Sequence, residues 1–261
     1  MKITQFVSIL TIALMVLLGG CAGNDSLTDT KTVSDIISGD RPAMWQLSDS
    51  DTQIVLFGTF HLLHTDTQWQ SPRLDAAMLA ATTTYLEADT ASAAAQAEVQ
   101  QAVQQYGVNP PGESLSSQLG ESRAKQFESV AAHFGIPLAA LEPLRPWLAT
   151  LTVTIAAMQQ SGLDSESGAD KQIFNKATAQ GDRIRYLESA GSQIEVLASL
   201  DELEEFGGFE QGMEQLMNYE AEIDAMIKAW LSGDEAELEQ RIIKEVKDVS
   251  PELASESSGA P

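Results

Sequence analysis

Cysteine, histidine and positive charge are all scarce in this sequence of 261 residues. It has one cysteine, Cys21, and a single thiol cannot form an intrachain disulfide framework. Lysine and arginine number 15 against 38 aspartates and glutamates, so the formal net charge is −23. That charge argues against nucleic acid as a partner and against direct adhesion to anionic lipid headgroups. After the N-terminal region, no apolar run reaches membrane-spanning length.

The N-terminal residues are typical of an export signal. Lys2 supplies a positive charge, and the apolar stretch over residues 6–18 is short for a membrane span. The tetrapeptide Leu18-Gly19-Gly20-Cys21 resembles the lipobox of bacterial lipoproteins, which implies a lipid anchor on Cys21. Ala22 follows in place of an aspartate that would resemble an inner-membrane retention signal, which favours the outer membrane, facing the periplasm. An ordinary secretory signal cut nearby is the alternative.

The remaining chain is long enough for one large domain with a sizeable core. We expect a signal peptide over residues 1–20 and a flexible tether over 21–40, which is rich in Asp, Ser, Thr and Gly. The domain is expected over 41–253, and a disordered tail over 254–261.

Short β-like runs alternate with helical patterns along this domain. Strands are predicted over 44–47, 53–60, 82–87 and 183–187, and helices over 94–105, 122–133, 147–160 and 169–180. Ile54-Val55-Leu56-Phe57 is an apolar run typical of a strand buried on both faces. Ser71-Pro72 is typical of a helix start, and Gly181 and Gly233 of helix ends. The pattern predicts the α/β class, with a mixed, mainly parallel sheet, flanking helices and a large helical C-terminal part.

Three predicted strands end in polar residues that could carry chemistry. They are His61, Glu87 and Glu188. Ligands of open α/β sheets bind outside the carboxyl ends of the strands, so these side chains could form part of a divalent-metal site. Gly58 would let the backbone pass close to such a site. The structural alternative is also open, since hydrogen-bonded carboxylates and single histidines are common at sheet edges.

A longer series of segments surrounds these residues. The segments are Pro42-Ala43-Met44-Trp45, Gly58-Thr59-Phe60-His61, Trp69-Gln70-Ser71-Pro72, Leu86-Glu87, Leu141 to Leu148, Gly168-Ala169-Asp170 and Leu187-Glu188. Their order and spacing resemble the TraB/GumN family, which also includes the animal TIKI proteases. The resemblance covers most of the chain after residue 41.

The resemblance implies a metal-dependent hydrolase fold with two Gly-x-x-His motifs. The first motif matches Gly58 and His61, and the glutamate of the family matches Glu87. The implied metal is Mn, Co or Zn, held by His61, Glu87 and Glu188, where it would activate water and polarise a carbonyl. Glu87 could be a ligand or a general base.

Two further residues match family positions, and each has a structural alternative. Arg145 could stabilise a developing anion, but it could also pair with Glu142. Asp170 could belong to the site, but it could also favour the dipole of the helix it begins.

No histidine follows His133, so we expect the second Gly-x-x-His motif to be absent. Three explanations are then open: the product is truncated, a partner chain completes the site, or the domain works without metal. His64 is interpreted as a loop residue and His133 as a packed residue of an amphipathic helix.

Two classes other than a hydrolase stay open. One is a non-catalytic envelope lipoprotein that binds a peptide, a metal or a cofactor; the ChaN-like lipoproteins, which resemble this family in fold, bind haem. The other is a helical module that uses the acidic stretch from Asp201 onward to contact a partner. The peptide or small molecule on which the chain would act is not indicated by the sequence.

Overall fold

The computed structural model describes residues 41–199 and 209–241. The strands are β1 (Met44–Ser48), β2 (Gln53–Phe57), β3 (Leu63–His64), β4 (Thr83–Ala88), β5 (Leu163–Asp164) and β6 (Arg183–Glu188). The helices are α2 (Pro72–Ala80), α3 (Ala93–Tyr106), α4 (Leu115–His133), α5 (Leu138–Leu141), α6 (Pro146–Gln160), α7 (Ala169–Gln180), α8 (Ala190–Ser199), α9 (Phe209–Met217) and α10 (Tyr219–Ser232), with a 3₁₀ turn over Ser165–Ser167. The α/β class predicted from the sequence is confirmed.

The described strands form three two-stranded sheets. β1 pairs with β2 and β3 with β5, both antiparallel, whereas β4 pairs with β6 in parallel. Burial of β2 on both faces was a wrong prediction, because Ile54 and Leu56 are about half exposed. Their neighbours Val55 and Phe57 pack against the core from the opposite face, as expected of a strand with one buried side.

Local signals explain most helix ends. The Ser71 side chain accepts a hydrogen bond from the backbone N–H of Leu74, and Pro72 occupies the first turn of α2. Gly181 ends α7 and Gly233 ends α10, each in the left-handed conformation that suits glycine. α4 begins earlier than the predicted residue 122, because a capping box at Ser114 starts it. A kink at Gly120 then interrupts the helix.

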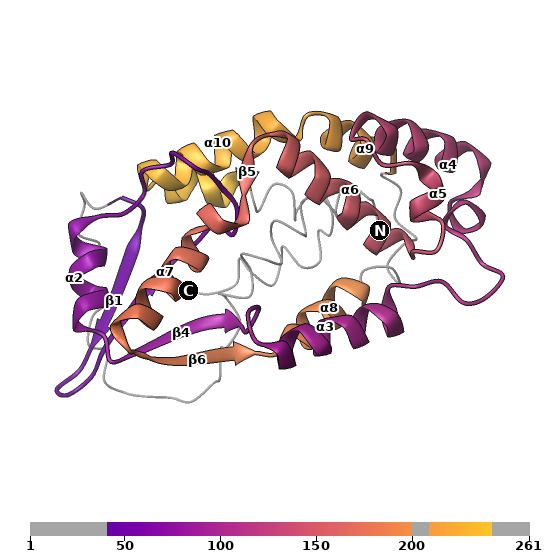
Figure 1. Ribbon diagram of the computed structural model, residues 1–261. Coiled ribbons are helices and arrows are strands. Elements are labelled where there is room, and N and C mark those ends of the chain that lie inside the picture. The colour runs from indigo at the N-terminus through magenta and orange to yellow at the C-terminus, as the bar shows by residue number, and fades with distance from the viewer. Residues whose placement is uncertain (1–40, 200–208, 242–261) are drawn as a thin grey trace, which may run out of the picture.

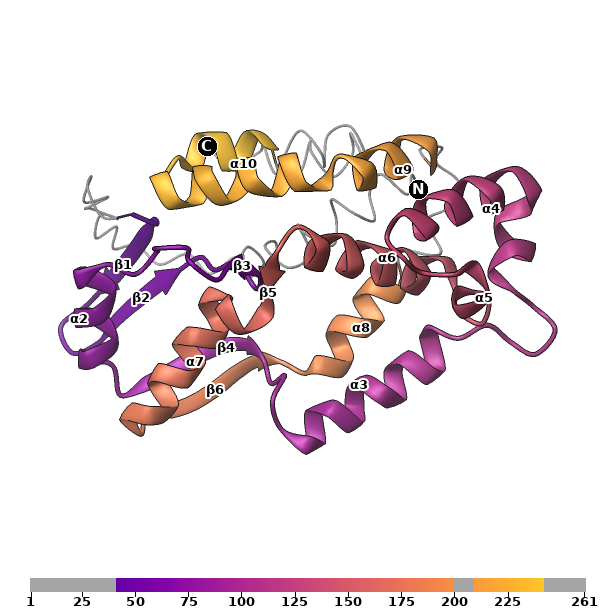
Figure 2. The same cartoon turned by 45° about the horizontal axis from the view of Figure 1, so that its top comes forward.

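The helices α4, α6, α9 and α10 carry much of the core. Figures 1 and 2 show α10 lying opposite the strands β4 and β6, with α3 and α8 side by side near the ends of those strands. An aromatic cluster joins β2 to α10, and its members are Phe57, Phe60, Trp69 and Trp230. This cluster positions the loop that follows β2, which carries His61.

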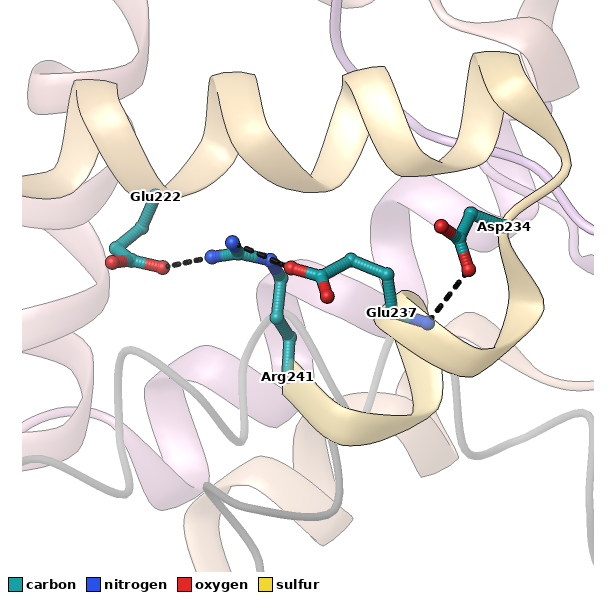
Figure 3. A network of polar contacts seen from close by, with 4 residues as sticks. All are labelled: Glu222, Asp234, Glu237 and Arg241. Carbon is teal, nitrogen blue, oxygen red and sulfur yellow. Dashed lines mark hydrogen bonds and ion pairs between the residues drawn. The ribbon is translucent and has the colours of Figure 1, made fainter.

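The turn after α10 is fixed by a polar network (Figure 3). The Asp234 carboxylate accepts a hydrogen bond from the backbone N–H of Glu237 at 3.0 Å and so caps the helical residues 235–241. Arg241 donates to Glu237 at 2.7 Å and to Glu222 of α10 at 2.8 Å. The network therefore ties the last described helical turns back onto α10.

None of the helices described within residues 41–199 and 209–241 is long and apolar enough to cross a membrane. The expected signal peptide, tether, Cys21 anchor and C-terminal tail lie outside these residues. Of the acidic stretch from Asp201 onward, residues 201–208 and 242–261 also lie outside them.

Candidate functional site

The loop after β2 holds His61 between two anchored backbone positions. The Trp230 indole Nε1 donates a hydrogen bond to the carbonyl oxygen of Gly58 at 2.9 Å. The backbone N–H of Ala169 donates to the carbonyl oxygen of Phe60 at 2.8 Å. The loop is thus tied to α10 on one side and to the start of α7 on the other.

Gly168 allows α7 to approach this loop closely. A Cβ at Gly168 would clash with the carbonyl oxygen and carbon of His61. No side chain fits there, so glycine at this position lets the first turn of α7 lie against His61. Gly58 has no such constraint, since a Cβ there would meet no heavy atom within 4 Å.

His61 lies between two carboxylates. Its Nδ1 lies 2.9 Å from Oδ2 of Asp170, which belongs to the first turn of α7. Its Nε2 lies 3.7 Å from Oε2 of Glu87, near the end of β4. The first separation is a hydrogen-bond distance, whereas the second is too long for one. The side chains of His61, Glu87 and Asp170 are 24%, 14% and 31% exposed.

This arrangement controls the proton on His61. Burial by itself lowers the pKa of the His61 imidazole. The hydrogen bond to Asp170 and the negative charges of Asp170 and Glu87 outweigh it and raise that pKa from 6.5 to about 9. Without a competing cation, His61 is therefore protonated at neutral pH.

Two carboxylate oxygens at this site are buried without a hydrogen-bond partner in the described part of the chain. They are Oε2 of Glu87 and Oδ1 of Asp170. Buried acceptors in native proteins nearly always have a partner, and a water or an ion is a common one. The two acceptors that lack a hydrogen-bond partner therefore belong to the two acidic side chains that flank His61.

The donor set fits a divalent cation in part. Two atoms bound to one ion at about 2.1 Å each can lie up to about 4.2 Å apart, and Nε2 of His61 and Oε2 of Glu87 fall within that range. Asp170 on Nδ1 matches the carboxylate that commonly orients a metal-bound histidine. Within the described ranges, no group of three or more His, Cys, Asp or Glu side chains could hold a metal.

A large cleft opens beside these three residues. Its volume is about 1590 Å³, and it is lined by β2, β4 and parts of α2 and α7 as well as by His61, Glu87 and Asp170. A substrate in this cleft would therefore have direct access to the side chains that flank His61.

Glu188 and Arg145 are not among the cleft-lining residues. Glu188 lies beside Ala88 in the β4–β6 pair, and its Oε1 accepts a hydrogen bond from Gln193 at 3.1 Å. Arg145 precedes α6, and its Nε is buried with no hydrogen-bond partner among the residues described. The carboxylate of Glu142 accepts hydrogen bonds from Ser116, which lower its pKa. The metal role of Glu188 and the catalytic role of Arg145 stay predictions.

The other two histidines lie elsewhere. His64 belongs to the short strand β3 rather than to a loop, and its Nε2 lies 3.0 Å from Oδ1 of Asp224 on α10. His133 is exposed at the end of α4 and contacts the ring of Phe134, so its prediction as a packed residue was wrong.

Sequence reasoning identified His61, Glu87 and Asp170 but not the role of Gly168 or Trp230. Gly168 directly before a predicted helix was an available signal for a close backbone approach. No local signal links Trp230 to Gly58, since 172 positions separate them.

Comparison with known proteins places the chain in a family. The model of the TraB/PrgY/gumN family matches residues 43–257. No curated protein and no solved structure matches the chain.

Proposed function

Since the chain belongs to the TraB/PrgY/gumN family, we propose that it is a metal-dependent hydrolase of the bacterial cell envelope. One observation carries the proposal. His61 is fixed through Nδ1 by Asp170, and its Nε2 faces Oε2 of Glu87, which is buried without a hydrogen bond among the residues described. Two potential metal-binding atoms, Nε2 of His61 and Oε2 of Glu87, therefore face one another beside a large cleft.

Each side chain has a defined task in this proposal. Asp170 holds the proton of His61 at Nδ1, so that Nε2 is the atom free to bind a cation. Glu87 supplies the second donor, or accepts a proton from the attacking water if it acts as general base. A divalent cation bound there would acidify its bound water and polarise the carbonyl of the substrate.

The cation would replace a proton. Because the pKa of His61 is about 9 when no cation is bound, Nε2 must lose its proton before it can bind one. Cation affinity is therefore expected to rise with pH over the neutral and mildly alkaline range.

The donor set favours Mn over Zn or Co. Catalytic zinc sites have three protein ligands, whereas two donor atoms face one another here among the residues described. Carboxylate and water ligands suit manganese, which can fill its remaining positions with water.

We also propose that lipid chains on Cys21 anchor the chain to the outer membrane, facing the periplasm. Support comes from the lipobox-like Leu18-Gly19-Gly20-Cys21 and from Ala22. Two or more acyl chains make such an anchor stable. The hydrolase would then act on periplasmic substrates.

The test is metal content of the full purified chain. Elemental analysis is made after exposure to Mn, Co or Zn, before and after chelation. We expect near-stoichiometric Mn in the wild type, removed by chelator, and its loss in His61→Ala and Glu87→Gln. His133→Ala is the matched control, because His133 is exposed and distant in sequence from the site. No bound metal in the wild type, or equal loss in His133→Ala, would contradict the proposal.

A second candidate is a non-catalytic envelope lipoprotein that binds a ligand in the cleft. The observation in its favour is that no group of three metal-ligating side chains occurs among the residues described. Saturable ligand uptake without metal-dependent turnover would support this candidate. Turnover lost on chelation and restored by Mn would support the hydrolase.

A further inference from the structure

A second, smaller pocket lies between β1, the loop after β2 and the end of α10. Its volume is about 110 Å³, and the helical residues that follow α10 complete its walls. Three of its lining residues, Trp45, Gly58 and Thr59, also border the large cleft, whereas the others do not. Neither His61 nor Glu87 lines it, so the pocket is separate from the candidate metal site.

Three aromatic rings line this pocket, and they belong to Trp45, Phe60 and Trp230. The ring centroids of Phe60 and Trp230 lie 5.3 Å apart and the rings are inclined by 58°, so they form two walls at an angle. Trp45, half-buried on β1, adds a third ring. Trp230 also packs against Phe57 and Trp69, which hold its ring in place. The aromatic surface is therefore formed before any ligand arrives.

Glu235 is the charged residue among those that line the pocket, and its carboxylate forms no ion pair within residues 41–199 and 209–241. Its acidic neighbours are engaged elsewhere, because Asp234 caps the helical turn and Glu237 accepts from an arginine (Figure 3). Arg41 is close to Gly233, since its Cγ would lie 3.6 Å from a Cβ added there, and its charge offsets part of that of Glu235. Attraction of a cation therefore needs the ring faces as well as the carboxylate.

Hydrogen-bond acceptors are scarce in the pocket. The carbonyl oxygen of Gly58 already accepts a hydrogen bond from Trp230, and that of Phe60 accepts one from the first residue of α7. The polar side chains in the lining are those of Thr59 and Glu235. Water and an unalkylated ammonium each need several hydrogen-bond partners, so neither is well accommodated. A fully alkylated ammonium donates no hydrogen bond, and it is attracted to the faces of aromatic rings, most strongly to those of tryptophan.

We propose that this pocket binds the trimethylammonium group of an organic cation such as choline. The rings of Trp45, Phe60 and Trp230 contact the methyl groups, and Glu235 balances the charge. The volume of about 110 Å³ is several times the ~10–15 Å³ that one water needs, which leaves room for a few methyl groups. The inference does not rest on the proposed hydrolase function, because none of these residues is a candidate metal donor.

The test is calorimetric titration of the full chain with three small probes, in the presence of chelator. Choline carries the trimethylammonium group, dimethylbutanol has the same shape with carbon in place of nitrogen, and ethanolamine carries an unalkylated ammonium. We expect saturable binding of choline and binding at least about ten-fold weaker for the other two, because one lacks the charge and the other lacks hydrogen-bond partners in the pocket. Absence of saturable choline binding, or dimethylbutanol binding as tightly as choline, would overturn the inference.

Variants locate the site. Trp45→Leu removes a ring and should weaken choline binding at least about five-fold, whereas Trp45→Phe keeps a ring and should bind within about three-fold of the wild type. Glu235→Gln should weaken binding by about two- to five-fold. Glu239→Gln is the matched control, because Glu239 is exposed on the same helical turns and does not line the pocket. If Trp45→Leu is folded by circular dichroism and binds choline as the wild type does, the inference is wrong.

Two sources carry this group, a free solute and the headgroup of phosphatidylcholine. Co-sedimentation with phosphatidylcholine vesicles that is weakened in Trp45→Leu would identify the lipid headgroup. Choline binding without such co-sedimentation would identify a solute. His61→Ala separates this inference from the proposed function, because it should abolish metal binding and leave choline binding unchanged. Loss of choline binding in folded His61→Ala would place the choline site elsewhere and overturn the inference.

Discussion

The carbonyl group of His61 occupies the space that a side chain at Gly168 would need. This contact brings the first turn of α7 against the loop after β2, and it places Asp170 at hydrogen-bond distance from Nδ1 of His61. The candidate site thus depends on a glycine that itself carries no chemistry.

Gly168→Ala should therefore displace α7 from the loop. Since the added Cβ would meet backbone atoms, we expect a loss of about 1–3 kcal/mol in the free energy of unfolding, together with weaker metal binding. Chemical denaturation and metal titration measure the two effects. Gly58→Ala is the control, because a Cβ at Gly58 meets no heavy atom within 4 Å. Equal stability of the Gly168 and Gly58 variants would refute the packing argument.

The stability of the metal-free chain should fall as pH rises from about 6.5 to about 9.5. The pKa of His61 is raised from 6.5 to about 9 in the folded chain, so folding binds a proton and is favoured below the unfolded pKa. That stabilisation is lost as pH rises through about 9, and its upper bound is about 3 kcal/mol. Thermal unfolding in chelator at several pH values measures it. His61→Gln should flatten the profile, while His133→Gln should leave it unchanged.

Asp170→Asn should weaken metal binding by about 10–100-fold without removing a donor atom from the cation. The amide keeps the shape of the side chain but loses the charge that raises the pKa of His61, so that pKa should also fall. Metal titration and a proton NMR titration of the His61 ring measure these effects. The same substitution at Asp224, which pairs with His64, should change neither. An unchanged His61 titration in Asp170→Asn would contradict the assigned contact.

Trp230→Phe should loosen the loop that carries His61. Phenylalanine retains an aromatic ring in the cluster with Phe57, Phe60 and Trp69, but it cannot donate to the carbonyl oxygen of Gly58. Leaving that acceptor unpaired should cost about 1–3 kcal/mol of stability. Denaturant unfolding measures this, and hydrogen exchange at residues 58–61 should become faster. If hydrogen exchange at residues 58–61 is as slow in the variant as in the wild type, the Trp230–Gly58 hydrogen bond does not hold the loop.

Cys21→Ser should release the chain from the membrane fraction of a bacterial host. The substitution removes the only thiol to which lipid could attach, while the remaining residues are unchanged. Fractionation and labelling with a radioactive fatty acid measure the anchor. Retention of label in Cys21→Ser would contradict lipidation at this residue.

Local sequence determined the helices and most of their ends. Ser71-Pro72, Gly181 and Gly233 act on the few residues beside them, so their effect does not depend on the rest of the fold. The strand ends also identified His61 and Glu87 as candidates, because a strand's carboxyl end is a local feature. The resemblance to a family added Asp170.

Only the tertiary structure decided how these residues meet. The apolar run Ile54-Val55-Leu56-Phe57 predicted a strand, but its burial depended on which strands would lie beside it, and β1 alone pairs with it among the residues described. In the same way, sequence spacing could not tell that Asp170 would contact His61 while Glu188 would contact Gln193. The first contact joins residues far apart in the chain and is set by the packing of α7 against the β2 loop. The second depends on the direction in which the Glu188 side chain lies, which the spacing of the residues does not give.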